Sequence, residues 1–285
     1  MDANLATLLV VCPDRKGIIA LVAQVLFAHG ANILDSDQHT DPVAGMFFQR
    51  IRFDASTLTA DRCVLEAQIR ELASRLAMTW RIAYGSQVRR VAILASKQEH
   101  CLYDLLIRHR TAELPCDIAM VISNHEAAAP IAAHFDVPFH HLPVGADTRL
   151  SQEAAVADLI VRSRIDLIVL ARYMQILSPA FVARFPTSII NIHHSFLPAF
   201  VGANPYRQAF EKGVKLIGAT SHYVTADLDQ GPIIEQETIR VSHRDSVDDL
   251  VRKGRDLEKT VLANAVRWHL QDRVLVYAGK TIVFE

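Results

Sequence analysis

Three side chains in the second half of the chain have the types and spacing to act on a carbonyl carbon. Asn191 and His193 come at the end of an apolar run, and Asp229 lies in a loop further along. An amide can donate to a developing oxyanion, an imidazole can move a proton near neutral pH, and a carboxylate can orient that imidazole. Asn191 and His193 point to the same side if their segment is extended. Together, Asn191, His193 and Asp229 have the groups needed for such chemistry and form a candidate catalytic set.

Each of these residues also has an ordinary structural explanation. An asparagine at a strand end is often a cap or turn residue, and an aspartate before Gln-Gly often forms a turn. His194 directly follows His193, and such a pair suggests metal ligands. No third ligand stands at a recognisable spacing, and the four cysteines form no CxxC pair, so the sequence predicts no metal. His194 fits a structural histidine equally well and stays outside the catalytic set.

Alternating strands and helices are expected to position the set. Short apolar runs of strand character occupy residues 91–95, 118–123, 167–171 and 188–193, and helical patterns occupy 101–110, 125–135 and 152–163. This alternation predicts an α/β domain with a mostly parallel sheet and helices on both faces. Ligands of such sheets bind outside the carboxyl ends of the strands, which is where Asn191 and His193 fall.

The N-terminal part follows a different pattern. Expected strands at 5–12, 32–39, 46–53 and 78–84 enclose helices at 18–28 and 62–76. The order βαββαβ is that of a ferredoxin-like domain. A polar connector at 85–89 separates this domain, residues 1–84, from a second domain at 90–285, which we expect to end with a long helix at 246–270 and a hairpin at 273–284.

Composition limits the partners of this chain. It has 285 residues, an apolar fraction of 51% and a formal net charge of -1. Nucleic-acid and membrane-surface proteins usually show a basic excess, and a membrane span needs about 20 apolar residues in a row. The sequence shows neither, so we expect a soluble cytoplasmic protein without a nucleic-acid or membrane partner.

Several ordered motifs carry a resemblance to a known family. They are residues 121–124, 170–178, 191–198, 218–224 and 227–231. From residue 91 to about 240 the chain resembles the folate-dependent formyltransferase family, which has a Rossmann-like fold. The resemblance implies catalytic roles for Asn191, His193 and Asp229. It also implies folate contacts by Arg172, Met174, Gln175, Ile176, Leu177, Ala226 and Asp227, where apolar walls with backbone hydrogen bonds suit a flat pterin ring.

The N-terminal domain resembles ACT domains, small modules that often bind an amino acid and commonly pair with one another. This resemblance implies a homo-oligomer, a dimer or tetramer. It also implies an effector site at Asp14, Gly17, Asn32 and Ile33. A purely structural dimerisation module fits the same residues equally well, because fold likeness does not establish a ligand.

The acceptor of the formyl group decides the reaction. Nucleotide transformylases of this family carry a glycine-rich phosphate loop after their first strand, whereas residues 95–102 here contain no glycine and include Glu99. Transformylases also have His-Pro-Ser where this chain has His193-His194-Ser195. Methionyl-tRNA formyltransferases carry a C-terminal RNA-binding domain that has no counterpart in this sequence.

Over nearly its whole length the chain resembles the formyltetrahydrofolate deformylase family. This implies hydrolysis of 10-formyltetrahydrofolate, a substrate rather than a cofactor, with no separate cofactor. The formate and free tetrahydrofolate would supply one-carbon and purine metabolism. Two alternatives stay open, formyl transfer to a nucleotide amine such as glycinamide ribonucleotide and a non-catalytic folate or amino-acid sensor.

Overall fold

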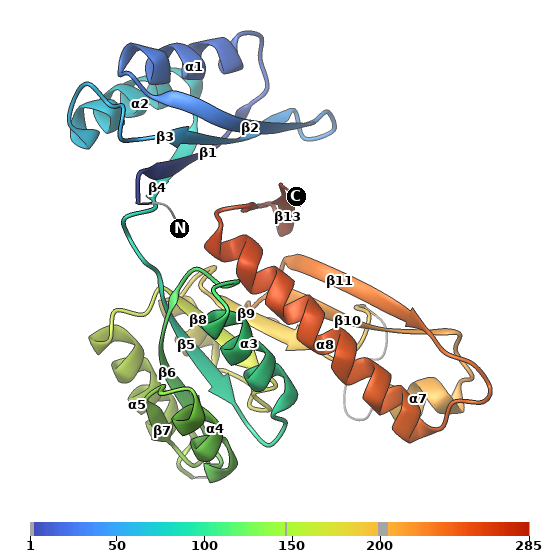
Figure 1. Ribbon diagram of the computed structural model, residues 1–285. Helices are drawn as coiled ribbons and strands as arrows, with labels where there is room; N and C mark the ends of the chain where they lie inside the picture. The colour runs from blue at the N-terminus through green and yellow to red at the C-terminus, as the bar shows by residue number, and fades with distance from the viewer. Residues whose placement is uncertain (1–2, 146, 199–204, 285) are drawn as a thin grey trace. The chain divides into compact units, whose positions relative to one another are not determined.

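The computed structural model describes residues 3–145, 147–198 and 205–284, and it divides the chain into two compact units (Figure 1). The first unit runs to Val88 and also includes Asp272–Tyr277 and the residues from Ile282 onward. The second unit comprises Arg89–Gln271 and Ala278–Thr281. Each unit has its own sheet and its own buried core.

The first unit has the βαββαβ order expected from the sequence. Its elements are β1 (Leu5–Pro13), α1 (Ile18–Ala28), β2 (Asn32–Asp41), β3 (Met46–Asp54), α2 (Arg62–Leu76) and β4 (Thr79–Tyr84). The strands lie in the order β2-β3-β1-β4, and every neighbouring pair is antiparallel. The ferredoxin-like fold is therefore confirmed.

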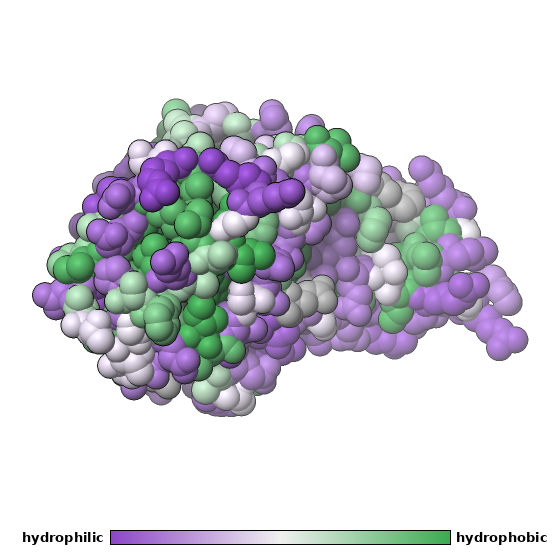
Figure 2. Space-filling model, turned by 90° about the horizontal axis from the view of Figure 1, so that it is seen from above, coloured by the Kyte–Doolittle hydropathy of each residue, from purple (hydrophilic) through white to green (hydrophobic). Residues whose placement is uncertain are grey.

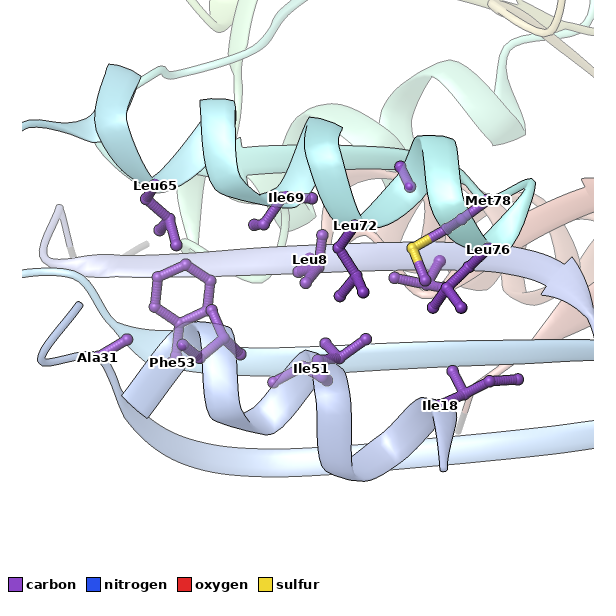
Figure 3. Packing of buried hydrophobic residues seen from close by; sticks show 14 of the residues in the cluster. Leu8, Ile18, Ala31, Ile51, Phe53, Leu65, Ile69, Leu72, Leu76 and Met78 are labelled. Carbon is purple, nitrogen blue, oxygen red and sulfur yellow. The ribbon is translucent and has the colours of Figure 1, made fainter. Parts of the chain in front are cut away.

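The two helices of this unit cover one face of its sheet. Alternate residues of β1 and β3, among them Leu8, Ile51 and Phe53, are buried against Ile69 and Leu72 of α2 (Figure 3). The period-2 pattern of the strands meets the helical stripe of α2, so both local patterns support one core. Gly30 has a φ of 78° after the C-cap of α1, which is the left-handed conformation that glycine readily adopts there.

The opposite face of the same sheet is covered by the C-terminus of the chain. The hairpin strands are β12 (Val274–Tyr277) and β13 (Lys280–Val283), and Phe284 is buried against Leu9 and Phe48. The compact units differ from the expected second domain at 90–285 at its end, because residues 272–277 and 282–284 group with the first unit. The apolar residues of the hairpin pack on the face that α1 and α2 leave uncovered.

The second unit is built on a larger, mixed sheet. Its elements are β5 (Arg90–Ala95), α3 (His100–Arg110), β6 (Asp117–Ser123), η1 (Glu126–Ala128), α4 (Ala129–His134), β7 (Phe139–His141), α5 (Arg149–Arg162), β8 (Leu167–Ala171), α6 (Pro179–Arg184), β9 (Ile189–His193), α7 (Pro205–Glu211), β10 (Leu216–Tyr223), β11 (Ile233–Arg240) and α8 (Val247–Leu270). The strand order is β11-β10-β9-β8-β5-β6-β7. The strands from β9 to β7 pair in parallel, whereas β10 is antiparallel to both its neighbours, so the expected mostly parallel sheet is confirmed.

Helices cover both faces of this sheet. Val156 and Ile160 of α5 and Phe181 of α6 pack on residues of the central strands such as Leu94 and Ile168. The helix α8 lies along β9, β10 and β11 and also packs against α3 (Figure 1). No helix in the described ranges is both long enough and apolar enough to cross a membrane.

Candidate active site

The predicted catalytic residues lie at the carboxyl edge of the larger sheet. Asn191 and His193 belong to β9, and His193 is its last residue. The antiparallel partner β10 places His222 directly opposite Asn191. Asp229 lies in the connection between β10 and β11. The strand β9 and the loop that follows β10 therefore bring together residues that are far apart in sequence.

Asp229 lies between His193 and His222 and contacts both. Its Oδ2 lies 3.2 Å from Nδ1 of His193, and its Oδ1 lies 3.6 Å from Nε2 of His222. Because Nδ1 of His193 faces Asp229, Nε2 is on the other side of the ring, where it is buried and has no hydrogen-bond partner among the described residues. This Nε2 is the atom placed to exchange a proton with a ligand.

The hydrogen bond from His193 is the largest of the effects that hold the pKa of Asp229 well below its ordinary value. Burial raises that pKa, but its effect is smaller than that of this hydrogen bond. Asp229 is therefore a carboxylate at neutral pH, and it can stabilise an imidazolium that forms on His193.

The loop that carries Asp229 is held by close backbone contacts. Asp229 has a φ of 55°, a left-handed conformation that is uncommon for residues other than glycine. Two residues later, a Cβ at Gly231 would lie 1.7 Å from the carbonyl oxygen of Tyr223. Pro232 O accepts a hydrogen bond of 2.9 Å from Tyr223 N, which fixes the same crossing. Glycine is thus required at 231 for the carboxylate of Asp229 to reach His193.

His222 orients the amide of Asn191, a role that the sequence did not reveal. Nδ1 of His222 lies 2.9 Å from the carbonyl oxygen of Tyr223, so Nδ1 carries the hydrogen and Nε2 can accept. Nδ2 of Asn191 lies 3.3 Å from that Nε2. One amide hydrogen of Asn191 is then used by His222, and the second is available to a carbonyl oxygen of a ligand. The motif 218–224 contained His222, but its pairing with β9 is a long-range contact.

The residues expected to contact folate fall into two groups. Met174 and Ile176 are more than half exposed, and Gln175, Leu177, Ala226 and Asp227 are exposed or partly buried. The loop after β8 is tied to α5, because the carbonyl of Ile176 accepts a hydrogen bond from Arg149. Exposed apolar side chains on an anchored loop suit a flat ligand.

Arg172 is placed differently from these residues. Its side chain is only 11% exposed, and its Nε lies 3.4 Å from Oε2 of Glu258 in α8. Glu258 also accepts hydrogen bonds from the hydroxyl of Tyr206 at 2.5 Å and from Nε2 of His100 at 2.7 Å. Burial raises the pKa of Glu258, but the bond from His100 and the charge of Arg172 outweigh it and lower the pKa. Glu258 is thus a buried carboxylate.

One group of possible metal ligands occurs within the described part of the chain. His100, Cys101 and Glu258 have ligand atoms within 4.8 Å of one another. Burial raises the pKa of the Cys101 thiol well above its ordinary value, so the thiol keeps its proton. The guanidinium of Arg172 already supplies a positive charge beside Glu258. These surroundings disfavour a cation.

The structure does not bring the predicted effector residues of the first unit together. Asp14 and Gly17 follow the end of β1, whereas Asn32 and Ile33 begin β2. Both strands pair antiparallel with β3, so they run in the same direction. The two pairs of residues therefore lie at opposite ends of α1, about 16 Å apart for a helix of this length. Within one chain they do not form a single site.

Comparisons with known proteins give the class of this fold and site. A family model described as formyl transferase matches residues 89–266, and one described as ACT domain matches residues 6–61. The chain is thus a two-domain protein, with an ACT domain followed by the catalytic domain of formyl transferases.

Relatives that match over nearly the whole chain identify one family within this class. A formyltetrahydrofolate deformylase from Synechocystis sp. is 53% identical over 98% of each chain. The crystal structure of a formyltetrahydrofolate deformylase from Pseudomonas syringae superposes with a TM-score of 0.96 at 48% identity, covering 99% of this chain and 94% of that one. By contrast, glycinamide ribonucleotide transformylase 1 from Symbiobacterium toebii has a TM-score of 0.66 at 33% identity and covers 70% of this chain and 95% of its own. The chain belongs to the formyltetrahydrofolate deformylase family.

Proposed function

We propose that this protein hydrolyses 10-formyltetrahydrofolate to formate and tetrahydrofolate, with Asn191, His193 and Asp229 as its catalytic residues. The observation that carries the proposal is the contact of 3.2 Å between Nδ1 of His193 and Asp229, which leaves the buried Nε2 without a partner in the described structure. An oriented imidazole with an open nitrogen can serve as a general base and then as a general acid.

The reaction follows from this geometry. Nε2 of His193 takes a proton from water while the water oxygen forms a bond to the formyl carbon. The carbonyl electrons move to the formyl oxygen, which accepts a hydrogen bond from the second amide N–H of Asn191. The intermediate then breaks its bond to N10 of the folate, and His193 returns its proton to that nitrogen. The carboxylate of Asp229 stabilises the imidazolium between these two proton transfers.

The loop after β5 favours water over a nucleotide amine as the acceptor. Oγ of Ser96 donates to Oδ1 of Asn124 at 2.6 Å and accepts from the backbone nitrogen of Met174 at 3.2 Å. This hydroxyl is therefore used inside the protein and is not available to a phosphate. Glu99, at the start of α3, adds a negative charge to the same loop. Both features oppose the binding of a phosphate dianion.

The direct test is to incubate the purified protein with 10-formyltetrahydrofolate and no acceptor, and to measure formate and tetrahydrofolate together. We expect equimolar release that is abolished in His193→Ala. His243→Ala removes an exposed histidine and serves as the matched control, with full activity expected. If no tetrahydrofolate forms until glycinamide ribonucleotide is added, the protein is instead a transferase.

A non-catalytic folate sensor is distinguished by Asn191→Ala. Loss of one oxyanion donor reduces kcat by about 10²–10³-fold in comparable enzymes. We expect this loss of turnover with folate binding retained. A sensor would show no turnover in the wild-type protein and unchanged folate binding in the variant.

We further propose that the first unit makes the protein a homo-oligomer and receives an amino-acid effector. The outer side of α1 exposes Ile19 and Phe27, at 44% and 82% respectively. Figure 2 views the molecule from the side on which α1 lies in Figure 1 and shows apolar side chains gathered among hydrophilic ones. An exposed apolar helix face favours association with a second copy. Because Asp14 and Asn32 lie at opposite ends of α1, an effector site that uses both would combine two chains.

The oligomer is tested by light scattering of the wild-type protein and of Phe27→Glu, which we expect to dissociate. Methionine and glycine are the effectors to try first, because an enzyme that drains one-carbon units benefits from such feedback. A bound effector must shift activity or thermal stability. A monomeric wild type, or no response to either amino acid, would contradict the corresponding part of the proposal.

A further inference from the structure

Arg172 is a buried cation whose hydrogen-bonding groups are incompletely used. Its Nε and Nη1 are both buried and, within the residues that the structure describes, neither has a hydrogen-bond partner. The contact of Nε with Glu258 is an ion pair at 3.4 Å. A buried donor left without a partner destabilises the folded protein, and more so when it is charged. Such a side chain calls for a ligand that accepts hydrogen bonds.

Glu258 holds the guanidinium of Arg172 from one side and is itself fixed. Tyr206 and His100 donate hydrogen bonds to its two carboxylate oxygens. The ring of Tyr206 lies directly against α8, since a Cβ at Gly254 would come within 2.1 Å of the Tyr206 hydroxyl. Glu258, which belongs to α8, is therefore anchored by His100 of α3 and Tyr206 of α7.

The backbone places Arg172 at the same edge of the sheet as the catalytic residues. The strands β8 and β9 pair in parallel with Leu170 beside Asn191. Arg172 and His193 each come two residues later and so leave their strands side by side. Arg172 has a φ of 60°, a left-handed conformation that is uncommon for residues other than glycine.

His194 follows the predicted catalytic histidine and lies within range of the charge of Arg172. The rings of His193 and His194 have centroids 5.3 Å apart, and His194 also contacts the ring of Tyr206. Burial, followed by the charge of Arg172, lowers the pKa of His194 to about 4. His194 is therefore uncharged at neutral pH, whereas Arg172 carries a positive charge that acts on its ring.

We propose that the guanidinium of Arg172 binds the oxygens of the one-carbon unit as it becomes formate. This inference rests on the proposed hydrolysis. When water adds, the formyl carbon carries two oxygens, the second from water. When the bond to N10 breaks, N10 takes one proton from His193, and the resulting formic acid releases the other water proton to solvent water and becomes formate. Arginine presents parallel N–H donors that match the two oxygens of a carboxylate.

This role would favour hydrolysis over formyl transfer. Transfer to an amine gives a neutral amide with one oxygen on the carbon, whereas hydrolysis ends in an anion with two. A permanent cation beside the reacting carbon stabilises the second outcome selectively. Arg172 is then a catalytic residue that recognises the product, in place of the folate contact that the sequence suggested.

Formate inhibition of the full-length protein tests this assignment. Wild type, Arg172→Lys and Arg172→Gln are compared for kcat, for KM with the formylated folate as substrate, and for the inhibition constant of added sodium formate. We expect Arg172→Gln to raise the inhibition constant at least tenfold and to lower kcat by about 10²–10³-fold, the range for one lost oxyanion donor. Arg172→Lys keeps the charge without the paired donors, so its kcat and formate inhibition constant should lie between those of wild type and Arg172→Gln.

A second variant separates this role from the simple neutralisation of Glu258. Arg172→Gln leaves a buried carboxylate without its cation, and this can unfold the protein. The double variant Arg172→Gln with Glu258→Gln removes both charges, so we expect thermal stability to recover while formate inhibition stays weak. Recovery of wild-type kcat and formate inhibition in the double variant would overturn the proposal. So would a wild type that formate does not inhibit, whereas a wild type that releases no formate would refute the hydrolysis itself.

Discussion

At the scale of single residues, the site depends on neighbours that hold the reacting groups. His222 contacts both Asn191 and Asp229. We expect His222→Phe to lower kcat about tenfold, equivalent to about 1.4 kcal/mol of lost transition-state stabilisation, with little change in KM. Steady-state kinetics measures this, and His243→Phe is the control at an exposed position. An unchanged kcat would show that Asn191 does not need His222 for its orientation.

Asp229 gives a prediction for stability as well as for activity. Its pKa is depressed in the folded protein, so its contribution to stability is present above the unfolded value of about 3.9 and is lost as the pH falls through the folded value. In urea denaturation we expect Asp229→Asn to be less stable than wild type between about pH 5 and pH 8. The difference should shrink below about pH 4.

The same substitution also tests the catalytic role of Asp229. The carboxylate orients His193 and stabilises its imidazolium, so we expect Asp229→Asn to lose about 10²–10⁴-fold in kcat at neutral pH. Full activity in the variant would contradict the role given to the carboxylate.

The sequence was sufficient to predict a candidate catalytic set, but not the residues that support it. Asn191, His193 and Asp229 combined residue types of known chemistry with an apolar strand, and the structure places His193 and Asp229 in contact. His222 and Glu258 were not found, because each acts through a partner that is distant in sequence. Sequence periodicity describes neighbours within one element and carries no information on such contacts.

At the scale of elements, the loop between β10 and β11 depends on one glycine. A Cβ at Gly231 would overlap the carbonyl oxygen of Tyr223. We expect Gly231→Ala to displace the loop and move Asp229 away from His193, and a shift of about 1 Å can lower the rate about 10²-fold. Activity and thermal unfolding are the measurements. Gly145→Ala is the control, because its Cβ would meet only a hydroxyl, Thr148 Oγ1, at 3.3 Å. Equal activity in both variants would contradict the argument.

The strands differ in how clearly their residue patterns predict them. The strand β8 is apolar throughout and was expected with its observed bounds. The strand β10 was not expected as a strand, because it contains Gly218, Thr220, Ser221 and His222. These residues are buried through hydrogen bonds, such as that of 3.0 Å from Oγ of Ser221 to the carbonyl of Asn191. Burial that is satisfied by polar contacts leaves no apolar pattern in the sequence.

At the scale of the whole molecule, the chain enters the second unit at Arg89 and returns to the first unit at Asp272. The return is anchored by Arg81, whose Nη1 lies 2.5 Å from a carboxylate oxygen of Asp272, and by Phe284 on Leu9 and Phe48. The sequence predicted the hairpin but not the sheet on which it packs, because its apolar residues would fit any uncovered sheet face. The first unit is therefore completed by residues from the far end of the chain.

This connectivity predicts the outcome of cutting the chain between the units. A protease site is introduced within residues 85–88, and the cleaved protein is examined by size-exclusion chromatography. We expect the two fragments to elute together, because the C-terminal hairpin is part of the core of the first unit. In the same protein truncated after Gln271, this contact is missing and cleavage should release the N-terminal fragment. If the truncated protein also stayed intact after cleavage, contacts other than the hairpin would hold the fragments together, and the return of the chain would not be the link.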